Sequence, residues 1–143
     1  MADIGAIVKK RLYAAVQISV GKIDDRAHSE HRFTTRTGQL ERSIEENVQG
    51  ATGAVYLNQN VAPYGIYVHA GTRPHVIVPK QKKVLRWPSG GNFVFSKVVH
   101  HPGTKPDEFI YQAMENSKAD IQKTFDSQIE KACNEIAAEL VRR

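Results

Sequence analysis

Two long helical patterns enclose a strand-forming segment, and this arrangement constrains the fold more than any other feature of the sequence. Apolar side chains recur at almost every fourth position over residues 3–23, which places one stripe along a helix. A similar repeat over residues 107–142 predicts a second helix, with Asp107 as its N-cap. Ser127 and Glu130 match a capping box that would break this helix near Asp126, whereas an unbroken helix would be a rod of about 50 Å.

The segment between the two helical patterns is rich in short strand-like runs. Residues 52–101 contain the runs "AVYLN", "HVIVP", "VLRW" and "NFVFSKVVH", separated by glycine, proline and asparagine. The "PSGGN" between the third and fourth runs predicts a hairpin loop. The run "APYGIYVHAGT" fits either a strand or a short helical turn.

Two further segments precede the strands. Residues 24–36 are polar and without periodicity, which predicts a loop or a segment that is ordered only by a partner. Residues 37–49 predict a short helix that begins with Thr37 as N-cap and carries Leu40, Ile44 and Val48 on one face. The expected fold of residues 1–143 is therefore a single α+β domain: an antiparallel sheet of about four strands, flanked by an N-terminal helix, a short second helix and a long C-terminal helix.

Charge is distributed very unevenly along the chain. Residues 47–106 contain seven Lys or Arg and no Asp or Glu, whereas residues 107–143 carry a net charge of −3. An acid-free segment produces a positive potential that attracts nucleic acid or acidic protein surfaces, such as the C-terminal helix of a neighbouring copy. Lys80, Lys82, Lys83 and Arg86 lie beside Trp87 and are candidates for such contacts, against the alternative of a solvated hairpin tip.

A doubled phrase raises the question of a ligand site. "HAGTRPH" at residues 69–75 is echoed by "HHPGTKPDE" at residues 100–108. The segment offers histidines but no carboxylate to complete or orient a metal site, and neither phrase has the spacing of a phosphate-binding loop. We therefore interpret the phrases as two neighbouring turns, and predict no catalytic residue, metal or cofactor.

Membrane insertion is not expected. The apolar N-terminal stretch is interrupted by Lys9, Lys10 and Arg11, so it is too short to cross a bilayer.

Three blocks of sequence together resemble a known family. "RTGQLERSI" at 36–44, "APYGIYVHAGTRP" at 62–74 and "VHHPGTKPDEFIYQAME" at 99–115 occur in the order and spacing of small neck and tail-completion proteins of tailed bacteriophages. Members of that family typically read Thr-Gly-x-Leu-x-x-Ser-Ile, then Tyr-Ala-x-Tyr-Val-Glu-x-Gly-Thr, then His-Pro-Gly-Thr before Pro-Phe. This chain departs from the pattern at His69, where an acid is common, at Gly65, and in "DEFIYQA".

The resemblance implies a structural virion protein without catalytic activity. It would form a homo-oligomeric ring, as a hexamer, in the virion neck, after assembly in the host cytoplasm. Its partners would be the head–tail connector and the tail tube or terminator proteins, with genomic DNA passing through the lumen. The alternative is a sequence-independent nucleic-acid-binding module that uses the basic region 73–105. The candidate subunit or partner contacts are Leu40, Ile44, Tyr64, Tyr67, His69, Gly71, Thr72, Arg73, Gly103, Thr104 and Phe109.

Overall fold

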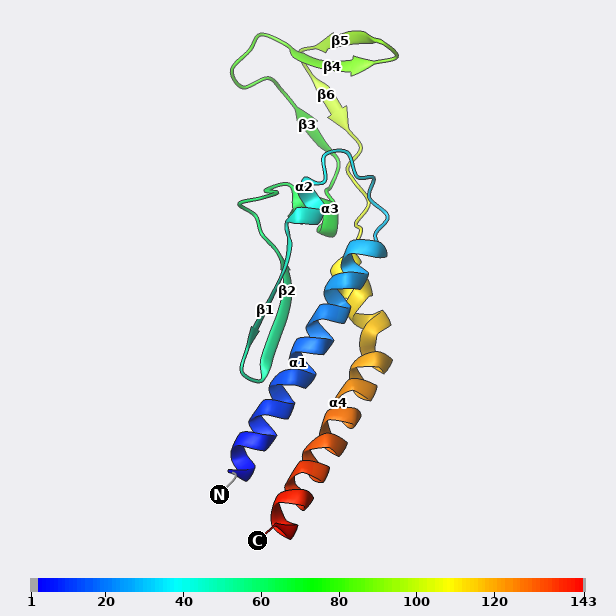
Figure 1. Cartoon of the computed structure of the whole chain (residues 1–143). Coiled ribbons are helices and arrows are strands. Elements are labelled where there is room, and N and C mark those ends of the chain that lie inside the picture. The colour runs from blue at the N-terminus through cyan, green and yellow to red at the C-terminus, as the bar shows by residue number, and fades with distance from the viewer. Residues whose placement is uncertain (1–2, 143) are drawn as a thin grey trace.

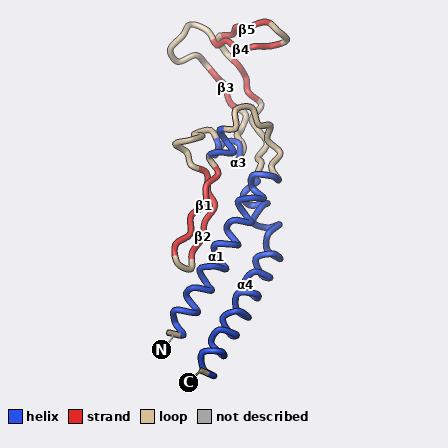
Figure 2. Tube along the Cα trace, in the orientation of Figure 1, coloured by secondary structure: helices blue, strands red, loops and turns tan. Residues whose placement is uncertain are grey.

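The computed structural model describes residues 3–142 and is dominated by two long antiparallel helices (Figure 1). Helix α1 spans Ile4–Ser29 and α4 spans Phe109–Val141, and the two pack along their length with both chain ends at the same end of the molecule. The strands lie beside and beyond this helical pair (Figure 2). The α+β class is confirmed.

Helix α1 is longer than predicted, because residues 24–29 are helical and only the rest of the predicted loop lacks regular structure. Ala27 is completely buried in the core, and Arg26 bonds Asp120 of α4 at 2.8 Å. Arg26 also pairs with Glu30 four residues later, which supports the last turn. Tertiary contacts thus extend the helix through a stretch whose composition suggested a loop.

Helix α4 is continuous, so of the two alternatives left open by the sequence the unbroken helix is the one present. Thr124 and Gln128 are buried against α1, where they accept hydrogen bonds from Lys22 and Arg11. Asp107 is not the N-cap, since Glu108 occupies that position and makes no side-chain capping bond.

The predicted helix over residues 37–49 is wrong beyond a single turn. Helix α2 covers only Gln39–Arg42, with Gly38 rather than Thr37 as N-cap, and strand β1 follows at Ile44–Gln49. β1 pairs with β2, Thr52–Leu57, across a two-residue loop in which Gly50 has φ of 59°. Such a loop needs a positive φ at its first position, and glycine supplies it.

The strands do not form the single four-stranded sheet that we predicted. Six short strands form three separate two-stranded antiparallel sheets: β1–β2, β3–β6 and β4–β5. The ambiguous run is the helix α3, Gly65–Ala70, and "NFVFSKVVH" divides into β5, Asn92–Ser96, and β6, Val99–His101. The remaining strands are β3, His75–Ile77, and β4, Leu85–Ser89, and the predicted loop between β4 and β5 is present, with Gly90 and Gly91 at positive φ.

The hydrophobic core is confined to the middle of the molecule. Ala27, Ile44, Phe109 and Ala113 form its buried cluster, where α1, β1 and the start of α4 meet. No residue of 66–106 is buried, and neither is any residue of 3–14 or 129–142. We call residues 75–101 the arm, because they project past the helices at the end of the molecule opposite the termini (Figure 1).

Candidate interaction site at the base of the arm

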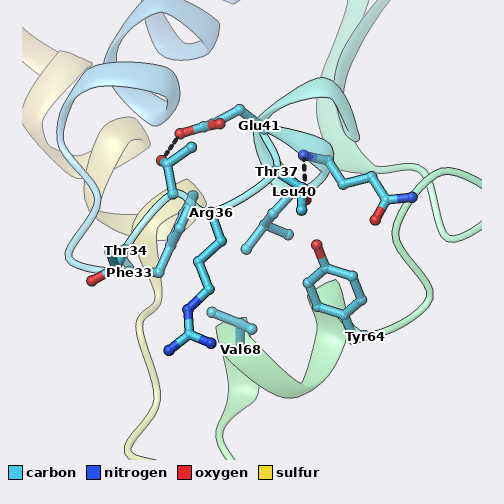
Figure 3. A pocket seen from close by; sticks show the side chains of 11 residues that line it. Phe33, Thr34, Arg36, Thr37, Leu40, Glu41, Tyr64 and Val68 are labelled. Atoms are coloured by element: carbon cyan, nitrogen blue, oxygen red, sulfur yellow. Dashed lines mark hydrogen bonds between the residues drawn. The ribbon is translucent and has the colours of Figure 1, made fainter. Parts of the chain in front are cut away.

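The three sequence blocks that carry the family resemblance meet at the base of the arm. The first two enclose a pocket of about 350 Å³ between the loop before α2 and helix α3 (Figure 3). Val68 of α3 and Tyr64, the N-cap residue of that helix, lie on one side of it, and Leu40 of α2 lies on the other. Thr35 donates a hydrogen bond to Glu41, which ties the loop to α2. The pocket is therefore lined by two segments that are distant in sequence, and this hydrogen bond fixes the loop segment to α2.

The second and third blocks meet through the doubled phrase. The Thr72 N–H donates to Thr104 O at 2.9 Å, and the Thr104 N–H donates to Thr72 O at 3.1 Å. This reciprocal pair, which we call the neck, joins the arm to the rest of the molecule. The prediction that the two turns are neighbours is confirmed.

Only glycine fits at positions 71 and 103, because the two backbone segments approach closely there and both residues have positive φ. Gly71 has φ of 73° and Gly103 has φ of 88°. A Cβ on Gly71 would lie 2.6 Å from Thr104 O, and one on Gly103 would lie 2.3 Å from Thr72 O. Any other residue would push the two segments apart.

A shallow hollow of about 640 Å³ opens beside the neck. His75 and His101 stack across the β3–β6 pair with ring centroids 5.0 Å apart, and they form one wall. Five of the predicted contact residues line the same hollow: Tyr67, Gly71, Thr72, Arg73 and Thr104. Its surface mixes aromatic rings with backbone polar groups, which suits a protein or nucleic-acid contact better than a small enclosed ligand.

His69, near the end of α3, has an aromatic environment. Its ring meets those of Phe109 and Tyr111 edge-on at 5.3 and 5.1 Å, and its Nε2 is buried without a hydrogen-bond partner. Burial lowers the pKa of His69, and the nearby carboxylates of Glu108 and Asp107 only partly offset this. His69 is thus held mainly in its neutral form, as a packing residue.

Asp107 locks the base of the arm to the loop after α1, a role that the sequence did not reveal. Its carboxylate accepts hydrogen bonds from the backbone N–H groups of Arg32 and Phe33, each at 2.8 Å. The Arg32 side chain adds a third bond to it at 3.3 Å. An acid just before a helix looks the same in sequence whether it caps that helix or binds a distant loop.

The arm presents basic and aromatic side chains to solvent. None of the seven Lys and Arg residues of 47–106 forms an ion pair with any residue of 3–142. Lys80, Lys82 and Lys83 are exposed in the loop before β4, and the Arg86 guanidinium lies 3.6 Å from the ring centroid of Phe93. The sequence analysis identified these cations but not the exposed rings of Phe93 and Phe95, because an unbroken apolar run resembles a buried strand.

The other predicted contact residues divide between core and surface. Leu40, Ile44 and Phe109 are buried within the chain, so their side chains are not available to a partner. Tyr67 is exposed on α3, Tyr64 is exposed at the N-cap of that helix, and Arg73 is exposed at the neck. The accessible part of the predicted site is therefore α3, the neck and the arm.

Within residues 3–142, no three His, Cys, Asp or Glu side chains are close enough to hold a metal ion together. The same residues include no helix that is both long and apolar enough to span a membrane. Comparison with protein-family models, with curated protein sequences and with solved structures finds no match to this chain.

Proposed function

We propose that this chain is a structural protein of a tailed-bacteriophage virion, which forms a ring that joins or completes the tail at the head connector. One observation carries the proposal: the three sequence blocks that resemble neck and tail-completion proteins converge on one junction, and an arm without a buried residue projects from it. The three blocks thus form the junction from which the arm projects. An exposed arm of this kind suits a protein that makes its contacts with other subunits.

The size of the exposed surface supports an assembled state. The chain exposes 10364 Å² at a mass of 16.0 kDa. A compact monomer of this mass exposes about 7,400 Å². A standard interface buries about 800 Å² on each partner, so the surplus is large enough for the two contacts that each ring subunit makes.

Quantitative mass spectrometry of purified particles of the encoding phage tests this proposal. We expect the chain to be present at about half the copy number of the portal protein, as a hexameric ring requires. Parity with the portal would instead indicate a twelvefold layer. Absence from the particles would refute the structural role.

A second candidate function is sequence-independent binding of nucleic acid by the arm. It is favoured by the seven Lys and Arg residues of the basic region 73–105, five of them in the arm, none of which forms an ion pair with any residue of 3–142. Duplex DNA affinity measured at rising salt concentration tests it, since contacts with phosphates weaken steeply as salt rises. Changing Lys80, Lys82, Lys83 and Arg86 to Glu should abolish such binding, and unchanged affinity would exclude this function.

A further inference from the structure

One face of the β4–β5 hairpin combines exposed aromatic rings with a guanidinium group. β4 pairs with β5 so that Arg86 is opposite Phe95 and Pro88 is opposite Phe93, which places these four side chains on the same face. We call this surface the ring face. Phe93 and Phe95 are 52% and 61% exposed, and the Arg86 guanidinium lies over the Phe93 ring. No ring or cation of residues 3–142 stacks on Phe95, so its π surface is free.

The charge around the ring face has one sign only. The arm contains no Asp or Glu and five exposed cations: Lys80, Lys82, Lys83, Arg86 and Lys97. None of them forms an ion pair with any residue of 3–142. The hairpin lies at the end of the arm, beyond the long helices and their acidic side chains (Figure 1). This local charge favours a polyanion as the partner of the arm.

The free ring narrows the choice of polyanion further than charge does. Lys83 and Lys97 lie just beyond the Leu85–Ser96 pair, which is the last pair of the hairpin at the end opposite its glycine turn. Cations beside exposed rings are the combination by which proteins hold single-stranded nucleic acid: the phosphates follow the positive charges and the bases stack on the rings. Sheet faces with exposed aromatic side chains bind unpaired bases in this way.

Two other anionic partners fit the ring face less well. Segments that bind a membrane surface keep their cations away from the apolar face that enters the lipid. Arg86 is instead on the ring face and lies against Phe93, so burial of this face in lipid would desolvate the guanidinium. In duplex DNA the bases are stacked on each other, so they offer no free surface to an exposed ring, whereas unpaired bases do.

We propose that the ring face binds single-stranded nucleic acid without sequence preference, with an unpaired base stacked on Phe95 and the phosphates held by the arm cations. The inference rests on the second candidate function, nucleic-acid binding by the arm. It deepens that function by naming the form of nucleic acid and the side chain that distinguishes a single strand from a duplex. It does not require the ring of subunits.

Fluorescence of Trp87 measures binding at this site in the full-length protein. Trp87 is the only tryptophan of the chain and lies on the opposite face of the same hairpin, across from Val94. It therefore reports a ligand on the arm without being the ring of the proposed contact. The probes are an oligothymidylate of about twelve nucleotides, an abasic strand of the same length and a duplex of the same length. The abasic strand keeps the phosphates but has no base to stack.

The oligothymidylate should bind more tightly than the abasic strand by about 5- to 100-fold, as expected for one stacked base. Phe95→Leu should remove most of this preference and leave the affinity for the abasic strand unchanged. Phe95→Tyr keeps the ring and should retain the preference. Tyr13→Leu, which removes an exposed ring of α1, is the control for rings elsewhere on the surface. Phe95 is more than half exposed, so the fold should survive its substitution.

Salt dependence separates the cations from the ring. Lys82→Gln/Lys83→Gln should weaken the binding of all three probes. For the single strand, the slope of log affinity against log salt concentration should fall by about 0.7 for each phosphate contact removed. Phe95→Leu should leave that slope unchanged, because stacking releases no counterion. A preference for the oligothymidylate that persists in Phe95→Leu, or that Tyr13→Leu removes equally, would overturn the proposal.

The outcomes distinguish this inference from the functions proposed above. Duplex binding as tight as that of the oligothymidylate would overturn the inference but keep nucleic-acid binding by the arm. Failure to bind any of the three probes would overturn both and leave the virion role standing. Phosphatidylserine vesicles that bind more tightly than the strand, through Phe95, would assign the ring face to lipid. An oligomer of the free protein that Phe95→Leu dissociates would assign it to a second copy, and either result would overturn the inference.

Discussion

The neck depends on two residues that have no side chain. Gly71 and Gly103 each face a backbone carbonyl of the other segment, and both have positive φ. The doubled Gly-Thr phrase therefore has a structural cause. Each glycine lies too close to a carbonyl oxygen of the other segment to carry a Cβ, and the two threonines that follow form hydrogen bonds with each other.

Gly103→Ala should destabilise the protein more than a glycine substitution elsewhere at similar φ. The conformation alone costs about 1–2 kcal/mol for a residue with Cβ, and the contact with Thr72 O adds to it. Gly50→Ala is the control, since Gly50 has φ of 59° and nothing within 4 Å of the added Cβ. Denaturant unfolding measures both free energies, and equal losses would show that the close approach does not matter. Amide exchange should accelerate at Thr72 and Thr104 only in Gly103→Ala.

His69 should make stability depend on pH. Burial lowers its pKa below the ordinary value of 6.5, so the unfolded state binds the proton first as the pH falls. The contribution of the neutral ring is complete above pH 6.5 and is lost as the pH falls from there toward the lowered pKa. His69→Phe keeps the edge-on contacts with Phe109 and Tyr111 but cannot titrate, so its advantage over the unsubstituted protein should grow on acidification. His100→Gln, at an exposed position, is the control, and parallel unfolding curves for His69→Phe and the unsubstituted protein would contradict the assignment.

At the scale of elements, the β1–β2 hairpin lies directly on α1. A Cβ on Gly53 of β2 would lie 2.2 Å from Val20 Cγ2 and 2.9 Å from Val16 Cγ1. The hairpin backbone thus touches the helix without an intervening side chain, which holds β1 and β2 in place although neither belongs to a larger sheet.

Gly53→Ala should cost about 1–3 kcal/mol of unfolding free energy, as overpacking does. Val20→Ala removes the group that the new methyl meets. In a double-mutant cycle, the double variant should therefore lose less stability than the sum of the two single losses. Additive losses would show that the hairpin moves away from α1 at no cost.

The sequence predicted the two long helices well, because their apolar stripes repeat over many turns. It failed for residues 44–49, since Leu40, Ile44 and Val48 keep the spacing of a helix while the pairing of β1 with β2 decides the structure. The division into three two-stranded sheets was not predictable either, because strand runs do not specify their partners. At the candidate site, the neighbouring turns followed from their repetition, whereas the role of Asp107 depends on a loop about 75 residues away.

At the scale of the whole molecule, a central core lies between two uncovered ends. The residues that stabilise the monomer are in α1, β1 and the start of α4, and the arm adds no buried residue to them. The stabilising core and the uncovered arm are thus separate parts of the chain. A hairpin of two strands has little stability of its own in water, so an arm of this kind gains from a partner that covers it.

Replacing residues 75–101 with a short Gly-Ser linker should therefore leave the stability of the remaining protein unchanged within about 1 kcal/mol. The Thr72–Thr104 pair and the Asp107 bonds lie outside the removed segment, so the base of the arm can still close. Under the proposed function, the same variant should no longer enter virions, which particle composition measures. A loss of several kcal/mol would instead mean that the arm stabilises its own subunit, and the separation of core from contact surface would be wrong.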